Sequence, residues 1–218
     1  MIIKANKDTA IVFDLDDTLY NEIDYLKSAF LEIAKNLEPK RWKFLFSQMF
    51  ALYKNNGDVF EMISKEYNVN KIDLIKNYRN HNPEIKAFPG VKNIITEIKA
   101  KGGKVGIITD GRKLTQEKKI NSLGLTDIID YAVISEEIGT EKPNEANFLK
   151  IENSFNCNAY YYIADNFKKD FIAPNKLGWK TIGIIDNGKN IHSNAHLYTD
   201  NKQTPQSLIF NFNDLEVN

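Results

Sequence analysis

Short apolar runs, separated by longer amphipathic segments, constrain the fold of this chain more than any other feature. The runs cover residues 10–13, 104–108, 131–134, 160–163 and 181–185, with 207–211 as one further candidate. Runs of this length are typical of fully buried strands. The segments between the later runs have apolar residues at helical spacing and end on glycine. The alternation predicts an α/β fold: a Rossmann-like, doubly wound parallel sheet with helices on both faces.

Residues 20–87 interrupt this alternation, because they contain helical patterns and no strand-like run. Within them, Asp58 and Asn70 stand at positions typical of helix N-caps. We therefore predict two domains: an α/β core formed by residues 1–19 and 88–218, and an all-helical cap domain formed by residues 20–87. A domain inserted directly after the first strand can act as a lid over the end of that strand.

The composition excludes several classes of function. Lysine plus arginine and aspartate plus glutamate each number 29, so no net charge attracts nucleic acid. The N-terminus is too short and polar for a signal peptide, and no run approaches the roughly 18 apolar residues that span a bilayer. The single cysteine, Cys157, excludes an internal disulfide and is typical of a reducing compartment. We expect a cytoplasmic protein that binds neither nucleic acid nor membranes.

The first apolar run leads into the sequence FDLDDTLY, residues 13–20, which crowds three carboxylates together. Asp14, Asp16 and Asp17 repel one another unless positive charge lies among them. One interpretation is a solvated acidic turn. The other is a magnesium and phosphate site, because open α/β sheets bind ligands at the carboxyl ends of their strands. This stretch alone does not decide between the two.

Polar groups follow the later apolar runs in the same way. They are Thr109, Asp110, Gly111 and Arg112 after the second run, Lys142 after the third, and Asp165 and Asp170 after the fourth. Taken singly, each group is common in a turn, a helix cap or a solvated surface. The carboxyl ends of parallel strands lie at one edge of a sheet, however, so these groups can converge on a single crevice. Their combination favours a functional site.

The complete set of motifs resembles that of the haloacid dehalogenase-like hydrolase superfamily. FDLDDT is similar to its first motif, IITDG to its second, EKP to its lysine motif and ADNFKKD to its last acidic motif. The likeness runs over the whole chain, and the helical insert has the position of the family's helical cap. The stretches TQEKKINSLGL and VISEEIGTEKPN look especially like the branch with nucleotide and acylneuraminate phosphatases.

This resemblance implies a Mg²⁺-dependent phosphatase that hydrolyses a small phosphomonoester, a sugar phosphate or a nucleoside monophosphate, through an aspartyl-phosphate intermediate. Asp14 is the implied nucleophile, and Asp16 the general acid and base. Mg²⁺ is expected on the Asp14 carboxylate, the Asp16 backbone carbonyl and Asp165, since hard oxygen ligands suit this ion. Asp170 is expected to orient a metal-bound water.

The resemblance also assigns the phosphate contacts. Thr109 and the backbone amides near Gly111 are expected to hold phosphate oxygens, and Lys142 to offset the anionic charge. Further candidates for substrate contact are Thr18, Asp110 and Arg112 in the core, and Arg79 and His81 in the insert. Two positions depart from the family pattern. Ala164 replaces the usual glycine, and Asp110 replaces the usual asparagine, a change that is harmless if Asp110 points away as a helix N-cap.

Three other functions compete with the phosphatase. A sugar-phosphate mutase shares the motifs and is the principal alternative. A haloacid dehalogenase does not need the second carboxylate of DLD, so Asp16 argues against it. A non-enzymatic binding module is the least favoured, because no catalytic position is missing. The sequence names neither the substrate, nor the oligomeric state, nor a role for the polar stretch 187–207.

Overall fold

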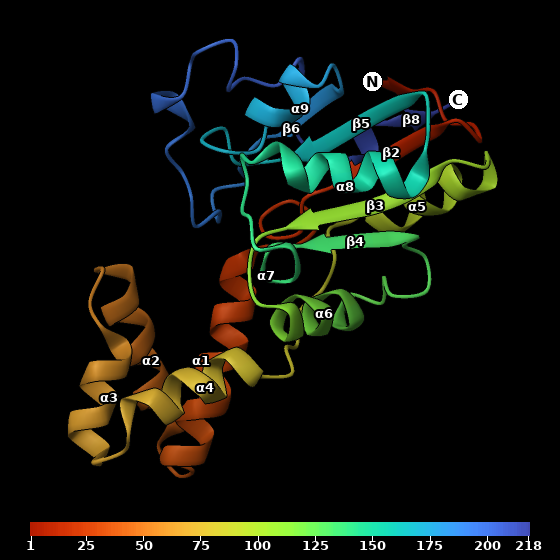
Figure 1. The fold of residues 1–218 in the computed structure, drawn as a ribbon. Coiled ribbons are helices and arrows are strands. Elements are labelled where there is room, and N and C mark those ends of the chain that lie inside the picture. The colour runs from red at the N-terminus through yellow and green to blue at the C-terminus, as the bar shows by residue number, and fades with distance from the viewer. The chain divides into compact units, whose positions relative to one another are not determined.

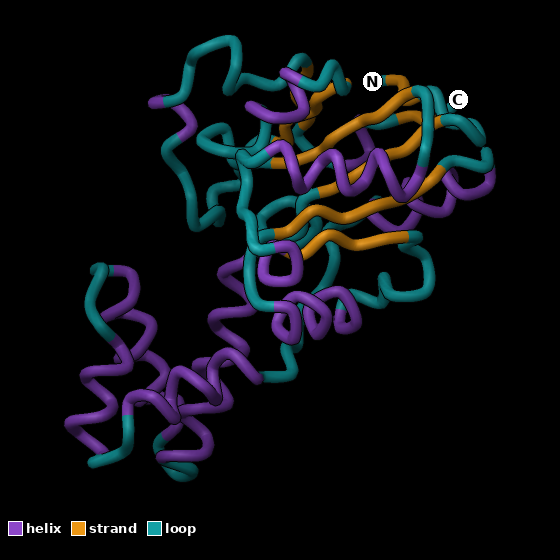
Figure 2. The backbone as a smooth tube through the Cα atoms, viewed as in Figure 1, coloured by secondary structure: helices purple, strands orange, loops and turns teal.

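The computed structural model describes all 218 residues and divides into two compact units. The core unit comprises Met1–Glu22 and Lys86–Asn218, and the helical unit comprises Ile23–Ile85. The tube in Figure 2 shows that strands occur only in the core unit. None of the helices has the length and apolar character that crossing a lipid bilayer requires.

A six-stranded sheet in the order β4-β3-β2-β5-β6-β7 forms the centre of the core unit. Its strands are β2 (Thr9–Phe13), β3 (Lys104–Thr109), β4 (Tyr131–Ile134), β5 (Ala159–Ala164), β6 (Lys180–Ile184) and β7 (Ser207–Ile209). Every neighbouring pair is parallel. Strand β2 is buried along its whole length because β3 and β5 flank it. A separate parallel pair joins β1 (Ile2–Ile3) to β8 (Glu216–Val217).

Helices cover both faces of this sheet, as Figure 1 shows for α8 on the near face and α5 on the far face. The helices of the core unit are α5 (Val91–Ala100), α6 (Lys113–Ser122), α7 (Ser135–Ile138), α8 (Glu145–Phe155) and α9 (Ile172–Lys176), with 3₁₀ turns at Ala195–Leu197 and Phe212–Asp214. The predicted fold class, a doubly wound parallel sheet, is confirmed. The candidate strand at 207–211 is shorter than expected, because Asn211 instead caps the following 3₁₀ turn.

The alternation of side chains along the strands supplies a hydrophobic core on each face. Val12 and Tyr162 belong to one buried cluster, in which the ring of Phe148 from α8 lies 5.0 Å from that of Tyr162. Phe13 points to the opposite face, where its ring lies 6.1 Å from that of Phe212. Each fully buried side chain of this size contributes about 1.5–3 kcal/mol. Packing on both faces thus fixes the strand ends that carry the site.

The helical unit has a core of its own. Its helices are α1 (Glu22–Leu37), α2 (Trp42–Lys54), α3 (Val59–Tyr67) and α4 (Lys71–Asn80). The rings of Tyr25, Phe30, Phe60 and Tyr78 form a cluster with centroids 5.5 to 6.2 Å apart. Both predicted N-caps are confirmed: the side chain of Asp58 accepts a hydrogen bond from the Glu61 amide, and that of Asn70 from the Ile72 amide.

Candidate active site

The carboxyl ends of β2, β3 and β5 meet at a cavity of about 100 Å³. Six carboxylates line it, Asp14, Asp16, Asp17, Glu22, Asp110 and Asp165, together with Thr109, Asn166, Lys169 and His192. The cavity forms because three buried strands end side by side, and each sequence turns from apolar to polar at that point. So many carboxylates require nearby cations if most of them are to remain ionised.

Lys142 is the cation paired with Asp14. Its Nζ lies 2.6 Å from an Asp14 oxygen and 2.8 Å from Asp170 Oδ1, although the second contact lacks hydrogen-bond geometry. Lys142 Nζ also donates to the Tyr162 hydroxyl at 3.2 Å. Burial raises the pKa of Asp14 to about 7, with Lys142 opposing this and Asp170 adding to it. Burial acts against the charge of Lys142, but Asp14 and Asp170 raise its pKa well above the ordinary value, so Lys142 stays protonated.

Asp14, Asp165 and Asp170 form a buried group that can hold a metal ion. Each offers a carboxylate oxygen, and these oxygens lie within 4.8 Å of one another. Asp165 accepts hydrogen bonds from the Thr18 hydroxyl at 3.1 Å and from the Asn190 amide at 3.0 Å. Burial, Asp170 and Asp14 raise the pKa of Asp165 well above its ordinary value. A divalent cation would relieve this repulsion, and three hard oxygen donors fit Mg²⁺.

The carboxylate of Asp16 contacts residues other than those around Asp14 and Asp165. It accepts hydrogen bonds from Lys119 Nζ at 2.7 and 2.9 Å, from Gln116 Nε2 at 2.9 Å, and from the Tyr20 hydroxyl. Burial would raise the pKa of Asp16, but Lys119 and the hydrogen bonds lower it below the ordinary value. Gln116 Nε2 also donates to Thr109 Oγ1 at 2.5 Å, so one amide group joins the carboxylate to that hydroxyl.

Asp110 does not cap a helix, so the condition under which its charge would be harmless is not met. Helix α6 begins three residues further on, at Lys113, with Arg112 at its N-cap and no side-chain cap. One Asp110 oxygen accepts the backbone N–H of Lys142 at 3.0 Å, and the other accepts Lys169 Nζ at 2.5 Å. The amide of Gly111, expected near phosphate, donates to Ser135 Oγ at 2.9 Å. The loop after β3 is therefore fixed by contacts within the protein.

A polar loop after β6 also reaches the site. Asp17 adopts a left-handed backbone conformation with φ 56°, and its two oxygens accept the N–H groups of Glu22 and Ile191, each at 2.7 Å. These bonds hold the loop so that Asn190 contacts Asp165 and His192 lines the cavity. Burial and the Lys169 charge lower the pKa of His192, which favours its neutral form.

Comparison with known proteins matches the part of the chain that contains these strand ends. The family model described as haloacid dehalogenase-like hydrolase matches residues 11–184. The chain belongs to this family. The predicted resemblance is confirmed, and the protein is a haloacid dehalogenase-like hydrolase.

Relatives of this hydrolase include glyceraldehyde 3-phosphate phosphatase from Pyrococcus abyssi, 27% identical over 189 residues that cover 79% of each chain. The pyrimidine 5'-nucleotidase YjjG of Escherichia coli is 28% identical over 152 residues, which cover 63% of this chain and 67% of that protein. Among solved structures, a HAD phosphatase from Thermococcus onnurineus has a TM-score of 0.62 at 17% identity, covering 94% of this chain and 95% of that chain. The last likeness concerns the fold.

The structure brings together most of the residues predicted from the family motifs. Asp14, Asp16, Thr109, Asp110 and Asp165 line the cavity. Thr18 contacts Asp165 and Lys142 contacts Asp14 from behind its wall, and an Asp170 oxygen lies within 4.8 Å of oxygens of Asp14 and Asp165. Arg112 is exposed at the start of α6. Sequence reasoning missed Gln116, Lys119, Lys169, Asn190 and His192. The one available signal was the spacing of Gln116 and Lys119, which places both on one face of a helix following the second motif.

The two candidates in the insert belong to the helical unit. His81 is buried there, with Nε2 2.7 Å from Ser28 Oγ and Nδ1 2.6 Å from a Glu32 oxygen. A substrate could bind the His81 ring only by displacing one of these partners. Arg79 is exposed near the end of α4. Substrate contact by either residue stays a prediction.

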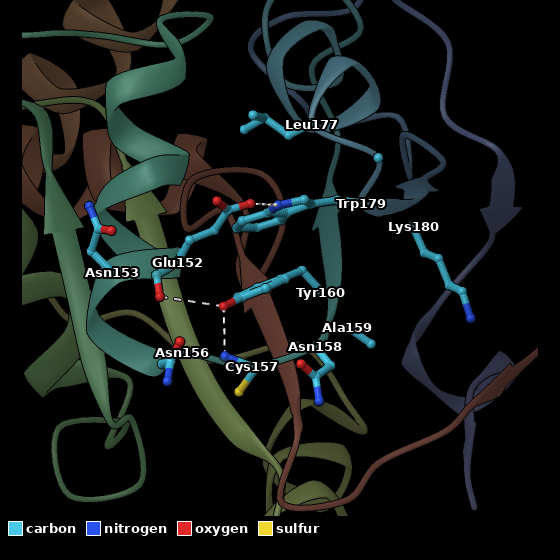
Figure 3. Close-up of a pocket in the computed structure, with 11 residues that line it drawn as sticks. Glu152, Asn153, Asn156, Cys157, Asn158, Ala159, Tyr160, Leu177, Trp179 and Lys180 are labelled. Atoms are coloured by element: carbon cyan, nitrogen blue, oxygen red, sulfur yellow. Dashed lines mark hydrogen bonds between the residues drawn. The ribbon is translucent and has the colours of Figure 1, made fainter.

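A larger cavity, about 620 Å³, lies at the opposite edge of the sheet, before β5 and β6 (Figure 3). Trp179 and Tyr160 stack there with ring centroids 4.7 Å apart. The indole N–H of Trp179 donates to Glu152 at 2.8 Å, and the Tyr160 hydroxyl accepts the Cys157 amide. These hydrogen-bonding groups are satisfied within the protein, so the arrangement is explained by packing.

Proposed function

We propose that this hydrolase is a Mg²⁺-dependent phosphatase that uses Asp14 as its nucleophile. The observation that carries the proposal is the pairing of Asp14 with Lys142 at 2.6 Å, in a cavity that also contains the carboxylate of Asp16. A carboxylate held by a buried ammonium and facing a cavity is oriented for attack on an incoming phosphorus atom. The phosphatase and nucleotidase names of the relatives support the same reaction class.

The reaction proceeds in two steps. An Asp14 oxygen forms a bond to phosphorus as the ester oxygen leaves, and Asp16 supplies the proton that this oxygen takes up. A water molecule then attacks the aspartyl phosphate and gives a proton to Asp16, which releases phosphate, frees the Asp14 carboxylate and returns Asp16 to its protonated form. Lys119 holds Asp16 in its ionised form, so Asp16 must leave Lys119 and take up a proton from solvent before it can protonate the leaving group.

Asp14, Asp165 and Asp170 would hold Mg²⁺, with the backbone carbonyl of Asp16 as an additional oxygen donor. When bound, the ion offsets the charge of the carboxylates and of the substrate phosphate. Lys142 neutralises the nucleophile from the buried side, and the Thr109 hydroxyl is placed to contact a phosphate oxygen.

We further propose that the substrate is a small phosphorylated metabolite. The helical unit begins after Glu22, shortly after the first motif, and the chain returns to the core unit at Lys86. An insertion at this position supports a role of the helical unit as a lid. A lid that excludes water also excludes a protein surface. Glyceraldehyde 3-phosphate and pyrimidine nucleotides, the compounds in the relatives' names, are small.

The test is a panel of small phosphomonoesters assayed for phosphate release with Mg²⁺ and with EDTA. Asp14→Asn should abolish turnover and keep the fold, because the amide is nearly isosteric but a poor nucleophile. Asp8→Asn, an exposed aspartate before β2, is the matched control. If Asp14→Asn retains turnover, Asp14 is not the nucleophile. A higher kcat/KM for folded phosphoproteins than for metabolites would contradict the proposed role of the helical unit as a lid. Phosphoryl return to a second hydroxyl of the substrate, in place of phosphate release, would indicate a mutase.

A further inference from the structure

The cavity that is to receive a phosphate dianion has an unusual charge balance. Six carboxylates line it, whereas Lys169 is the single lysine or arginine of the lining. An anion entering this cavity meets strong repulsion unless cations face it, and besides the proposed Mg²⁺ these must come from side chains of the wall. Lys169 is the one lining side chain that carries such a permanent positive charge.

The other two lysines of the site are occupied elsewhere. Lys142 is 1% exposed at its side chain and lies between Asp14 and Asp170. Lys119 is 5% exposed and is bonded to both oxygens of Asp16. Both side chains therefore offset carboxylates of the site and do not line the cavity. Lys169, in contrast, is 30% exposed, and its partner Asp110 is 13% exposed.

We infer that Lys169 is a phosphate-binding residue of this enzyme and that Asp110 is its counter-charge. This inference rests on the proposed function. Asp110 is itself fixed, because its other oxygen accepts the backbone N–H of Lys142 at 3.0 Å. The second oxygen of Asp110 accepts a hydrogen bond from Lys169 Nζ at 2.5 Å. An ammonium group has three N–H donors, so Lys169 can keep Asp110 and still donate to a phosphate oxygen.

The pair also explains the departure from the family pattern at position 110. An asparagine there can accept the Lys142 N–H, but it carries no charge to hold a lysine. An aspartate without Lys169 would place an additional negative charge beside the phosphate. Aspartate and lysine together add no net charge, and they deliver one ammonium group to the cavity.

Substitution of the two partners should affect phosphate binding differently. Lys169→Met removes the cation and leaves the Asp110 charge without its partner, so it should raise the Kd of phosphate by about 10-fold. This factor lies at the lower end of the range for hydrogen bonds to charged groups, because the pair is partly exposed to solvent. Asp110→Asn keeps the cation and removes its counter-charge, so phosphate should bind equally well or more tightly. The double variant should bind more tightly than Lys169→Met alone. Lys169→Arg should retain most of the affinity.

The experiment measures the Kd of inorganic phosphate by titration calorimetry, with Mg²⁺ present, for the full-length protein and these variants. Lys168→Met is the matched control, because Lys168 is the adjacent exposed lysine and does not line the cavity. Its Kd should change less than about 2-fold, since an exposed charge is largely screened. Circular dichroism and the melting temperature check the fold of every variant.

Three results would overturn the assignment: no phosphate binding by the unaltered protein, equal shifts for Lys169→Met and Lys168→Met, or Asp110→Asn weakening phosphate as much as Lys169→Met. Failure of the proposed function is distinguishable from these. If phosphate binds and the variants show opposite effects, but no phosphomonoester is hydrolysed, the phosphatase proposal fails and Lys169 remains an anion-binding residue.

Discussion

Replacing Asp165 with asparagine should stabilise the metal-free protein and remove its response to Mg²⁺. The carboxylate oxygens of Asp165, Asp14 and Asp170 lie within 4.8 Å of one another. Two unit charges at that separation repel by about 3.5 kcal/mol at an effective dielectric constant of 20. Lys142 offsets Asp14 and Asp170, so we expect about 1–2 kcal/mol of relief when Asp165 loses its charge.

The asparagine can keep the hydrogen bonds that Asp165 makes. Its oxygen can accept from the Asn190 amide, and its NH₂ group can donate to the Thr18 hydroxyl, which also has acceptor capacity. The gain of about 1–2 kcal/mol therefore corresponds to roughly 2–8 °C in melting temperature for a chain of this size. With Mg²⁺ at about 100 times its Kd, the unaltered protein should gain about 2.7 kcal/mol. Asp165→Asn, which lacks a charged ligand, should gain much less.

The assay is a melting curve in EDTA and in excess Mg²⁺ for the unaltered protein, Asp165→Asn and the control Asp127→Asn, an exposed carboxylate before β4. The expected pattern is a reversal: the variant melts higher in EDTA, and the unaltered protein gains more from Mg²⁺. Asp127→Asn should follow the unaltered protein in both conditions. If Asp165→Asn melts lower in EDTA, or if Mg²⁺ raises both proteins equally, the reasoning about this carboxylate group is refuted.

Three further predictions concern other parts of the chain. Lys119→Met should lower the free energy of unfolding, measured in urea, by about 2 kcal/mol, because it leaves Asp16 without its cation. Adding Asp16→Asn should recover part of this loss, and additive losses in the double variant would contradict the pairing. Asn70→Ala should cost about 1 kcal/mol by removing the N-cap of α4, whereas Asn70→Asp should not; equal urea midpoints for the two variants would argue against the cap. Burial raises the pKa of the Cys157 thiol, so iodoacetamide at neutral pH should alkylate it more slowly than free cysteine, and faster reaction would show that the thiol is activated.

The sequence predicted the sheet and the strand-end groups well for a physical reason. Strands buried on both faces, such as β2 and β5, consist of short apolar runs in the sequence. Because the strands are parallel, the residues that follow each strand lie at the same edge of the sheet. The positions of Asp14, Thr109 and Asp165 follow directly from that geometry.

The partners of these groups could not be predicted in the same way. Lys119 and Gln116 look like residues of a solvated helix face, and only the rotation of α6 against the sheet buries them beside Asp16, about 100 positions away in the chain. Asp110 looked like a helix cap because TDG after a strand often is one. Its contact with Lys169 depends on where the loop after β5 passes, which no local pattern encodes.

The central position of β2 has a consequence for synthesis of the protein. Its two neighbours, β3 and β5, begin at Lys104 and Ala159, so the apolar segment Thr9–Phe13 leaves the ribosome long before either partner exists. The helical unit, which packs on its own residues, can fold during this interval. Strand β2 meanwhile keeps two unpaired edges, the kind of surface that recruits chaperones or aggregates. Nascent chains arrested before β5 should therefore bind chaperones through residues 9–13, while their helical segment is already resistant to protease.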